Sequence, residues 1–237
     1  GLALHLAELE EVQVDGITLS SEQLCLAHER AETRDLKHRV KFELQDYRNL
    51  TKTYDGIVSV GMFEHVGVPH YRDYFDQIAA RMSNDGTALI HTIGRATGPG
   101  ATNPWIAQHI FPGGYIPALS EILPAIEKAG LVVLDIEILR IHYAETLKAW
   151  RERFMSHADE AAALYDERFV RMWEFYLVCS ELSFRYGFHN VFQIQLAKRQ
   201  DAAPLTRDYL YETAWTPKSS LQEAPANDEK AAARGRE

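Results

Sequence analysis

The sequence has few cysteines, no excess of basic charge and no long apolar run. Cys25 and Cys179 are its only cysteines and lie without metal-ligand spacing, so we expect free thiols, a reducing cytoplasm and no metal site. The net charge of −9 argues against nucleic-acid binding, which normally brings a basic excess. No run is long enough to span a bilayer and no signal peptide is recognisable, so a membrane would be met at its surface only.

The composition is that of a soluble globular protein. Of 237 residues, 46% are hydrophobic and 25% charged, which is enough for one core. Beyond about Ala203, the residues Ala, Glu, Lys and Arg dominate with almost no apolar spacing. We therefore expect residues 1–199 to form the folded domain and residues 200–237 to be a disordered tail.

Strand and helix patterns alternate through the first half of the chain. Ser20, with Gln23 three residues later, fits a capping box at the start of one helix, and apolar residues at steps of three and four from Tyr71 to Met82 mark another. The alternation predicts an α/β fold with a doubly wound, mostly parallel sheet. Its expected strands are Val12–Leu19, Val40–Leu44, Asp55–Val58 and Gly86–Gly94.

The second half starts with an insertion rich in glycine, proline and aromatic residues, from Gly94 to about Pro117. A long insertion between sheet elements is typical of a lid or binding loop. After it we expect a helix at 120–129, a strand at 131–139, a helical region at 145–186 broken once near Ser156, and a last strand at 192–196. That strand is predicted to be antiparallel and to lie at or near the sheet edge.

Glu64 and His91 stand where two consecutive strands end. Ligands of open α/β sheets bind outside the carboxyl ends of the strands, and a right-handed crossover brings the two strands near each other. A carboxylate and an imidazole in one crevice are candidates for acid–base chemistry. The alternative is that Glu64 belongs to a solvated acidic loop.

Five motifs in order give the chain a family resemblance over roughly residues 1–198. The chain resembles the cyclopropane-fatty-acyl-phospholipid synthases, S-adenosylmethionine-dependent methyltransferases that include the mycolic acid cyclopropane synthases. The resemblance implies a Rossmann-like class I methyltransferase with a helical and aromatic lid. The motifs are Gly16-Ile17-Thr18-Leu19-Ser20-x-x-Gln23, the stretch from Ser59 to Gly67, Leu89-Ile90-His91-Thr92-Ile93-Gly94, Ile110-Phe111-Pro112-Gly113-Gly114, and His142-Tyr143-x-x-Thr146-Leu147-x-x-Trp150.

The resemblance also predicts an N-terminally incomplete domain. In the family a glycine-rich loop after the first strand cradles the cofactor and runs into the helix that starts here at Gly1. By this comparison the first strand, most of that loop and an N-terminal substrate lobe are lacking, and we expect the chain alone to bind S-adenosylmethionine weakly or not at all.

The family assigns cofactor-binding roles to residues at the ends of two strands. The resemblance implies that the ribose and amino-acid side of S-adenosylmethionine is lined by Thr18, Leu19 and Gln23. It places Asp46 and Tyr47 near the adenine, and Gly1 is a further cofactor-binding residue. A short acidic side chain can accept a hydrogen bond from the adenine amine, and an aromatic ring offers a stacking face.

The family also implies a catalytic base, a bound bicarbonate held by Glu64, His91, the Ile93 amide and the Tyr143 hydroxyl. Because two adjacent anions repel, Glu64 either accepts a hydrogen bond from the bicarbonate hydroxyl or is protonated. Cys179 lies one residue before the position of a family cysteine, and is expected to be a packed thiol rather than a nucleophile.

The implied reaction is methylene transfer to the cis double bond of unsaturated phospholipid acyl chains, through a carbocation that closes to a cyclopropane. The alternatives are a methyl-branching fatty acid methyltransferase and a non-catalytic fragment. The expected setting is the cytoplasm, peripheral to the inner membrane face, and a homodimer is one alternative for the oligomeric state. Two interpretations remain for the basic residues of the long helical region: they dock the protein on a membrane, or they form a solvated helix face. These residues are Lys148, Arg151, Arg153, Arg168 and Arg171.

Overall fold

A computed structural model describes residues 1–212. Residues 1–202 form one compact unit, and residues 203–237 belong to a second, of which the described part holds the short helix α9 (Tyr209–Glu212). The predicted disordered tail falls mainly on residues 213–237, which lie outside the described range. Among residues 1–212, no helix is both long and apolar enough to cross a membrane.

The first half of the chain alternates strands and helices as predicted. The Ser20 hydroxyl accepts the Gln23 N–H at 3.2 Å and so caps α2, although the Gln23 side chain bonds Thr18 rather than closing the predicted capping box. The elements are α1 (Leu2–Leu9), β1 (Val14–Thr18), α2 (Ser21–Thr33), β2 (Val40–Leu44), β3 (Tyr54–Val60), α3 (Tyr71–Arg81) and β4 (Met82–Arg95).

In the second half, the predicted long helical region is broken twice rather than once. The chain turns after Met155, as expected, and again at Tyr165 and Asp166, where the Asp166 carboxylate caps a new helix by accepting the Phe169 N–H. The elements are α4 (Pro104–His109), α5 (Leu119–Lys128), β5 (Val132–Ile138), α6 (His142–Met155), α7 (Ala158–Leu164), α8 (Glu167–Tyr186) and β6 (His189–Ala197).

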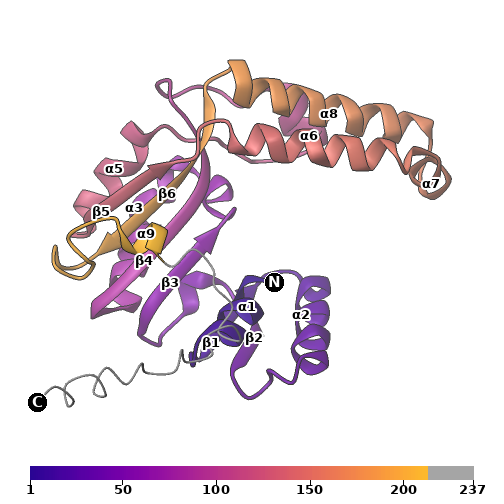
Figure 1. The fold of residues 1–237 in the computed structure, drawn as a ribbon. Coiled ribbons are helices and arrows are strands. Elements are labelled where there is room, and N and C mark those ends of the chain that lie inside the picture. The colour runs from indigo at the N-terminus through magenta and orange to yellow at the C-terminus, as the bar shows by residue number, and fades with distance from the viewer. Residues whose placement is uncertain (213–237) are drawn as a thin grey trace, which may run out of the picture. The chain divides into compact units, whose positions relative to one another are not determined.

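The strands of the described chain form two sheets (Figure 1). β1 and β2 pair in parallel, and the larger sheet has the order β3-β4-β6-β5. β3 and β4 are parallel, whereas β6 is antiparallel to both of its neighbours, as predicted, and lies one place in from the edge strand β5. The two sheets are connected by side-chain hydrogen bonds between β1 and the start of β3. The Asp15 carboxylate of β1 accepts hydrogen bonds from Lys52 at 2.8 Å and from Tyr54 at 3.1 Å.

Each face of the larger sheet carries its own cluster of apolar side chains. On one face, α3 and α5 pack their buried residues, Phe75 and Ile122 among them, against Ile90 and Ile194. On the other, Ile93 contacts the cluster that α6 and α8 build around Leu147 and Leu177. The alternation of side chains along β4 therefore sends Ile90 and Thr92 into the first cluster, and His91 and Ile93 to the second face.

Candidate active site

Glu64 lies in a tight turn directly after β3. Gly61 and Gly67 have φ values of 62° and 82°, a conformation that glycine adopts without steric cost, and the Gly61 N–H continues the sheet ladder by donating to the His91 carbonyl at 3.0 Å. The short helical turn Phe63–His65 buries Phe63 completely against Tyr71, 4.3 Å between ring centroids. Phe63 thus anchors the turn and fixes the position of the next residue, Glu64.

The two carboxylate oxygens of Glu64 have different surroundings. Oε1 accepts the Ile93 N–H at 2.7 Å, while Oε2 is buried and has no hydrogen-bond partner among the described residues. The Glu64 carbonyl accepts the Tyr115 N–H at 2.8 Å, so the insertion between β4 and α5 is tied to the same residue. A buried oxygen without a donor is costly unless a ligand or water supplies one.

His91 stands opposite Val60 in the β3–β4 register and on the same face of β4 as Ile93. Burial lowers the pKa of the imidazole, and the nearby Glu64 charge partly offsets that effect. The ring is therefore neutral at pH 7, with one nitrogen that donates and one that accepts.

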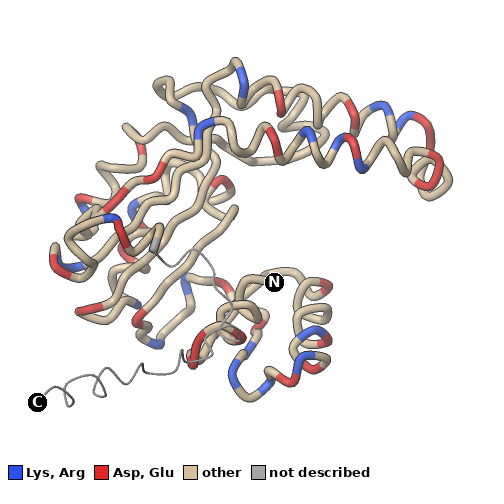
Figure 2. The backbone as a smooth tube through the Cα atoms, in the orientation of Figure 1, with Lys and Arg blue, Asp and Glu red and all other residues tan. Residues whose placement is uncertain are grey.

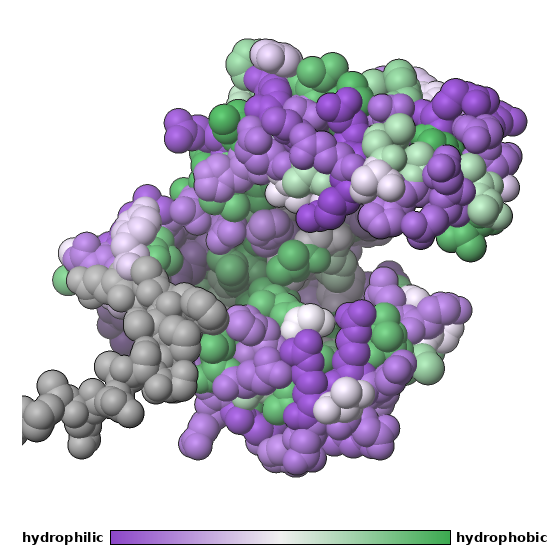
Figure 3. Space-filling view, turned by 45° about the vertical axis from the view of Figure 1, so that its right-hand side comes forward, coloured by the Kyte–Doolittle hydropathy of each residue, from purple (hydrophilic) through white to green (hydrophobic). Residues whose placement is uncertain are grey.

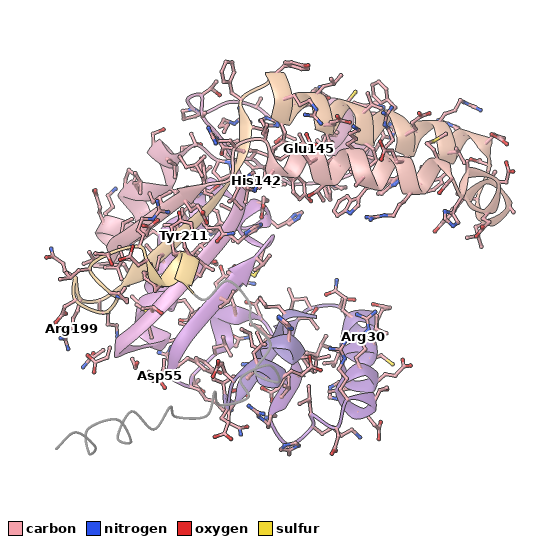
Figure 4. All side chains as sticks on the ribbon, viewed as in Figure 1. Arg30, Asp55, His142, Glu145, Arg199 and Tyr211 are labelled. Carbon is pink, nitrogen blue, oxygen red and sulfur yellow. The ribbon has the colours of Figure 1, made fainter. Side chains whose placement is uncertain are left out.

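Tyr143 is the second residue of α6, the helix on which Figure 4 labels His142 and Glu145. Its ring packs against Phe184 at 5.1 Å and Trp150 at 5.8 Å between centroids. Burial and, to a smaller extent, Glu64 raise its pKa. The hydroxyl thus stays protonated at neutral pH and can donate a hydrogen bond.

The structure therefore brings the four expected catalytic groups to one place, with one difference from the expectation. The Ile93 amide was assigned to a bound anion, and here it donates to Glu64 itself. The sequence reasoning did not select Tyr71 and Tyr74, whose side chains are buried and whose pKa values are raised mainly by that burial. In the sequence, two hydroxyl groups on an otherwise apolar helix face were the pattern that could have drawn attention to these residues.

The expected cofactor residues lie at the ends of β1 and β2. The Thr18 hydroxyl donates to the Gln23 side chain at 2.9 Å, and Leu19 next to it is 74% exposed, unusual for a leucine at a strand end. Gly1 is the N-cap of α1. No hydrogen bond found among the described residues joins Thr18 or Gln23 to Glu64.

Asp46 and Tyr47 differ in how far they fit their expected role. The Asp46 carboxylate is engaged by Arg48 at 2.6 Å, which lowers its pKa, so adenine would have to share or displace that partner. Tyr47 packs edge-on against Tyr74 at 5.5 Å. Since Tyr74 also contacts Phe63, aromatic packing connects the adenine side to the turn that carries Glu64. Figure 3 shows a hollow with hydrophobic surface on one face of the molecule.

Comparison with known proteins agrees with this arrangement. The family model described as mycolic acid cyclopropane synthetase matches residues 1–194. A probable fatty acid methyltransferase of Pseudomonas putida is 38% identical over 89% of this chain and 56% of its own length. The cyclopropane-fatty-acyl-phospholipid synthase of Escherichia coli K12 is 39% identical over 84% of this chain and 50% of its own. The chain thus spans about half the length of these curated relatives.

Solved structures give the same result for the fold. The cyclopropane synthase MmaA2 from Mycobacterium tuberculosis has a TM-score of 0.77 at 30% identity, covering 82% of this chain and 73% of that one. The mycolic acid cyclopropane synthase CmaA1, complexed with SAH and CTAB, has a TM-score of 0.75 at 26% identity, covering 81% and 72%. The fold is thus the Rossmann-like α/β fold of S-adenosylmethionine-dependent methyltransferases, and the chain belongs to the mycolic acid cyclopropane synthetase family.

Proposed function

We propose that this protein is an S-adenosylmethionine-dependent enzyme that forms a cyclopropane ring at the cis double bond of an unsaturated phospholipid acyl chain. The observation that carries the proposal is the Glu64 carboxylate, which is fixed at one oxygen by Ile93 and has the other oxygen buried and unpaired. The name of the 39%-identical relative in Escherichia coli supports the same reaction.

The group around Glu64 suits a small acid that brings its own hydroxyl, as bicarbonate does. The unpaired Oε2 needs a donor, while the Tyr143 hydroxyl and the neutral His91 ring offer donors of their own. We infer that Glu64, His91 and Tyr143 hold bicarbonate here, and that Glu64 receives the proton or hydrogen bond of its hydroxyl. That arrangement avoids two bare anions side by side.

The residues proposed for S-adenosylmethionine are Gly1, Thr18, Leu19, Gln23, Asp46 and Tyr47. The exposed Leu19 and the half-buried Tyr47 ring offer apolar contacts, and Thr18 and Gln23 offer polar ones. The bound cofactor supplies an activated methyl group on a sulfonium. The solved relative complexed with SAH supports the choice of cofactor.

The site must also exclude water, because a carbocation beside water is trapped before the ring closes. The second face of the sheet supplies apolar material for this. Tyr143, Tyr176 and Phe184 surround the Leu147 and Leu177 cluster there, and Phe111 of the insertion contacts Tyr176 at 6.0 Å between ring centroids. We propose that the acyl chain lies along these side chains.

A second function, methylation of the same double bond without ring closure, is favoured by other relatives. The protein of Pseudomonas putida is a probable fatty acid methyltransferase, and the tuberculostearic acid methyltransferase UfaA1 of Mycobacterium tuberculosis is 40% identical over 78% of this chain. Both reactions begin with methyl transfer to an olefinic carbon, so the same residues serve either.

The test is to identify the product. The protein purified from its native source would be incubated with S-adenosylmethionine and vesicles of dioleoylphosphatidylglycerol, and the released acyl chains analysed by mass spectrometry and proton NMR. Ring formation adds one CH₂, removes the olefinic signals and produces the high-field signals of a cyclopropane. A branched methyl signal would support the second function, and unchanged acyl chains would contradict both.

A further inference from the structure

A pocket that none of the proposed catalytic residues lines lies between α4 and α8. It has a volume of about 280 Å³ and is lined by Trp105, His109, Arg168, Arg171, Met172 and Phe175. The α8 residues are spaced three or four apart and therefore share one helix face. Trp105 contacts Phe175 edge-on, 4.9 Å between centroids, so the two helices meet at the apolar side of the pocket.

The charge of this pocket is not neutralised. Arg168 and Arg171 are exposed, and the ion pairs found among the described residues include neither. By contrast, Lys148 on α6 lies 4.0 Å from Glu152, and Arg185 at the end of α8 pairs with Glu145 and Glu181. Figure 2 shows acidic and basic positions interspersed along α6 and α8.

Apolar side chains are exposed next to the two arginines. Leu164, the last residue of α7, and Tyr165, which follows it, are 80% and 70% exposed. The Tyr165 ring stacks on Phe169 at 4.4 Å between centroids. Phe175 is 53% exposed. Paired arginines match the oxygens of a phosphate, whereas exposed leucine and aromatic side chains suit the boundary between lipid headgroups and acyl chains.

We propose that this pocket binds the phosphodiester headgroup of an anionic phospholipid, with Arg168 and Arg171 on the phosphate and Trp105, Phe175 and Leu164 against the upper acyl chain. The inference rests on the proposed function, because it identifies the headgroup class of that substrate. It also chooses between the two alternatives for the basic residues of α6 and α8, because it places the docking surface at the Arg168–Arg171 face of α8 and not at the basic residues of α6.

Free phosphate is the alternative source of the same oxygens, and the exposed apolar residues argue for the lipid. A small inorganic anion gains nothing from Leu164 or Phe175. A headgroup at a bilayer surface brings acyl carbons to the same place, and burying apolar area contributes about 25 cal/mol per Å².

The test is vesicle co-sedimentation of the full chain without S-adenosylmethionine, using vesicles of dioleoylphosphatidylglycerol or of dioleoylphosphatidylcholine. We expect binding to phosphatidylglycerol only, and a loss of roughly thirtyfold in the R168Q/R171Q variant, as for two basic groups removed from an anionic surface. L164S should weaken binding without changing the charge. Excess inorganic phosphate should leave the protein bound. Circular dichroism checks that the variants fold.

The matched control is R30Q/K128Q, which removes the same charge from two exposed residues, one on α2 and one on α5, and should stay within about twofold of the parent chain. Equal losses in the two double variants would show a diffuse field and overturn the pocket. Unchanged binding by R168Q/R171Q, or release by inorganic phosphate, would overturn it too. Because no methyl transfer is measured, a failed product assay with intact Arg-dependent binding would count against the reaction alone.

Discussion

At the scale of single residues, the unequal surroundings of the two Glu64 oxygens are the main result. Strand ends and the crossover rule predicted that Glu64 and His91 lie near each other. The hydrogen bond from Ile93 could not be predicted in the same way, because it depends on the backbone turn at Gly61, with its φ of 62°, and on how far Phe63 sinks into the core. Such details follow from packing between distant segments, which no local pattern contains.

Replacing Glu64 by glutamine should slow product formation by roughly two to four orders of magnitude, the contribution typical of a positioned acid–base group. Glutamine can keep the bond from Ile93 but offers an amide where Oε2 stands. The measurement is the initial rate with vesicle substrate, with thermal melting as a check on folding. Glu127→Gln, at an exposed position of α5, is the matched control. Near-normal turnover by the Glu64 variant would return this turn to a structural role.

His91 should make stability depend on pH. Burial lowers its pKa, so the unfolded chain binds the proton more readily, and the free energy of unfolding rises with pH between the lowered value and the ordinary value of about 6.5. That contribution is complete above this window and is lost as the pH falls through it. Urea unfolding at several pH values should show a shallower slope for His91→Asn than for the parent chain. His189, whose pKa burial also lowers, contributes a slope of the same sign in both proteins, and identical slopes in the two would exclude a role for His91.

At the scale of elements, the close contact of β4 with β6 leaves no room for a side chain at Gly94. A methyl group there would overlap the ring of Phe192, which is 1% exposed and cannot move aside.

Gly94→Ala should therefore lower the free energy of unfolding by about 1–3 kcal/mol, the usual cost of overpacking a core. Gly98→Ala is the control, since its added carbon meets no atom within 4 Å. Chemical denaturation of both variants gives the comparison. Equal stability of the two would mean that β6 lies further from β4 than described.

The sequence predicted most helices and strands because each carries its own periodicity. The second helix break was missed because the apolar positions continue in phase across Asp166, although an aspartate three residues before Phe169 is itself a cap signal. The sequence predicted only that β6 lies at or near the edge of the sheet. Its position between β4 and β5 could not be predicted, because strand order depends on pairings between residues remote in sequence.

At the scale of the molecule, the two sheets have separate cores. Leu4, Ala31, Leu36 and Val40 form a small cluster around β1 and β2, distinct from the cluster beneath the larger sheet. The Asp15 bonds to Lys52 and Tyr54 are among the links between them. A few polar links transmit less cooperativity than a shared apolar core.

Leu4→Ala should consequently loosen one part of the molecule only. Truncating a buried leucine costs about 2–5 kcal/mol, and amide hydrogen exchange in β1 and β2 should accelerate while β4 and β6 keep their protection. Ile194→Ala, in the larger core, is the reciprocal variant. Hydrogen exchange read by mass spectrometry gives both patterns, and acceleration throughout the chain in Leu4→Ala would show a single cooperative unit.

The position of β6 also affects the order in which the protein can fold during synthesis. Chains emerge from the ribosome N-terminus first, so β4 and β5 are made well before β6, the strand that joins them. Until residue 197 has left the exit tunnel, β4 lacks one neighbour and β5 has none within the sheet. The nascent chain must therefore carry open edges on both β4 and β5 through the synthesis of the whole α6–α8 helical region, a period in which chaperone binding would protect them from pairing with other chains.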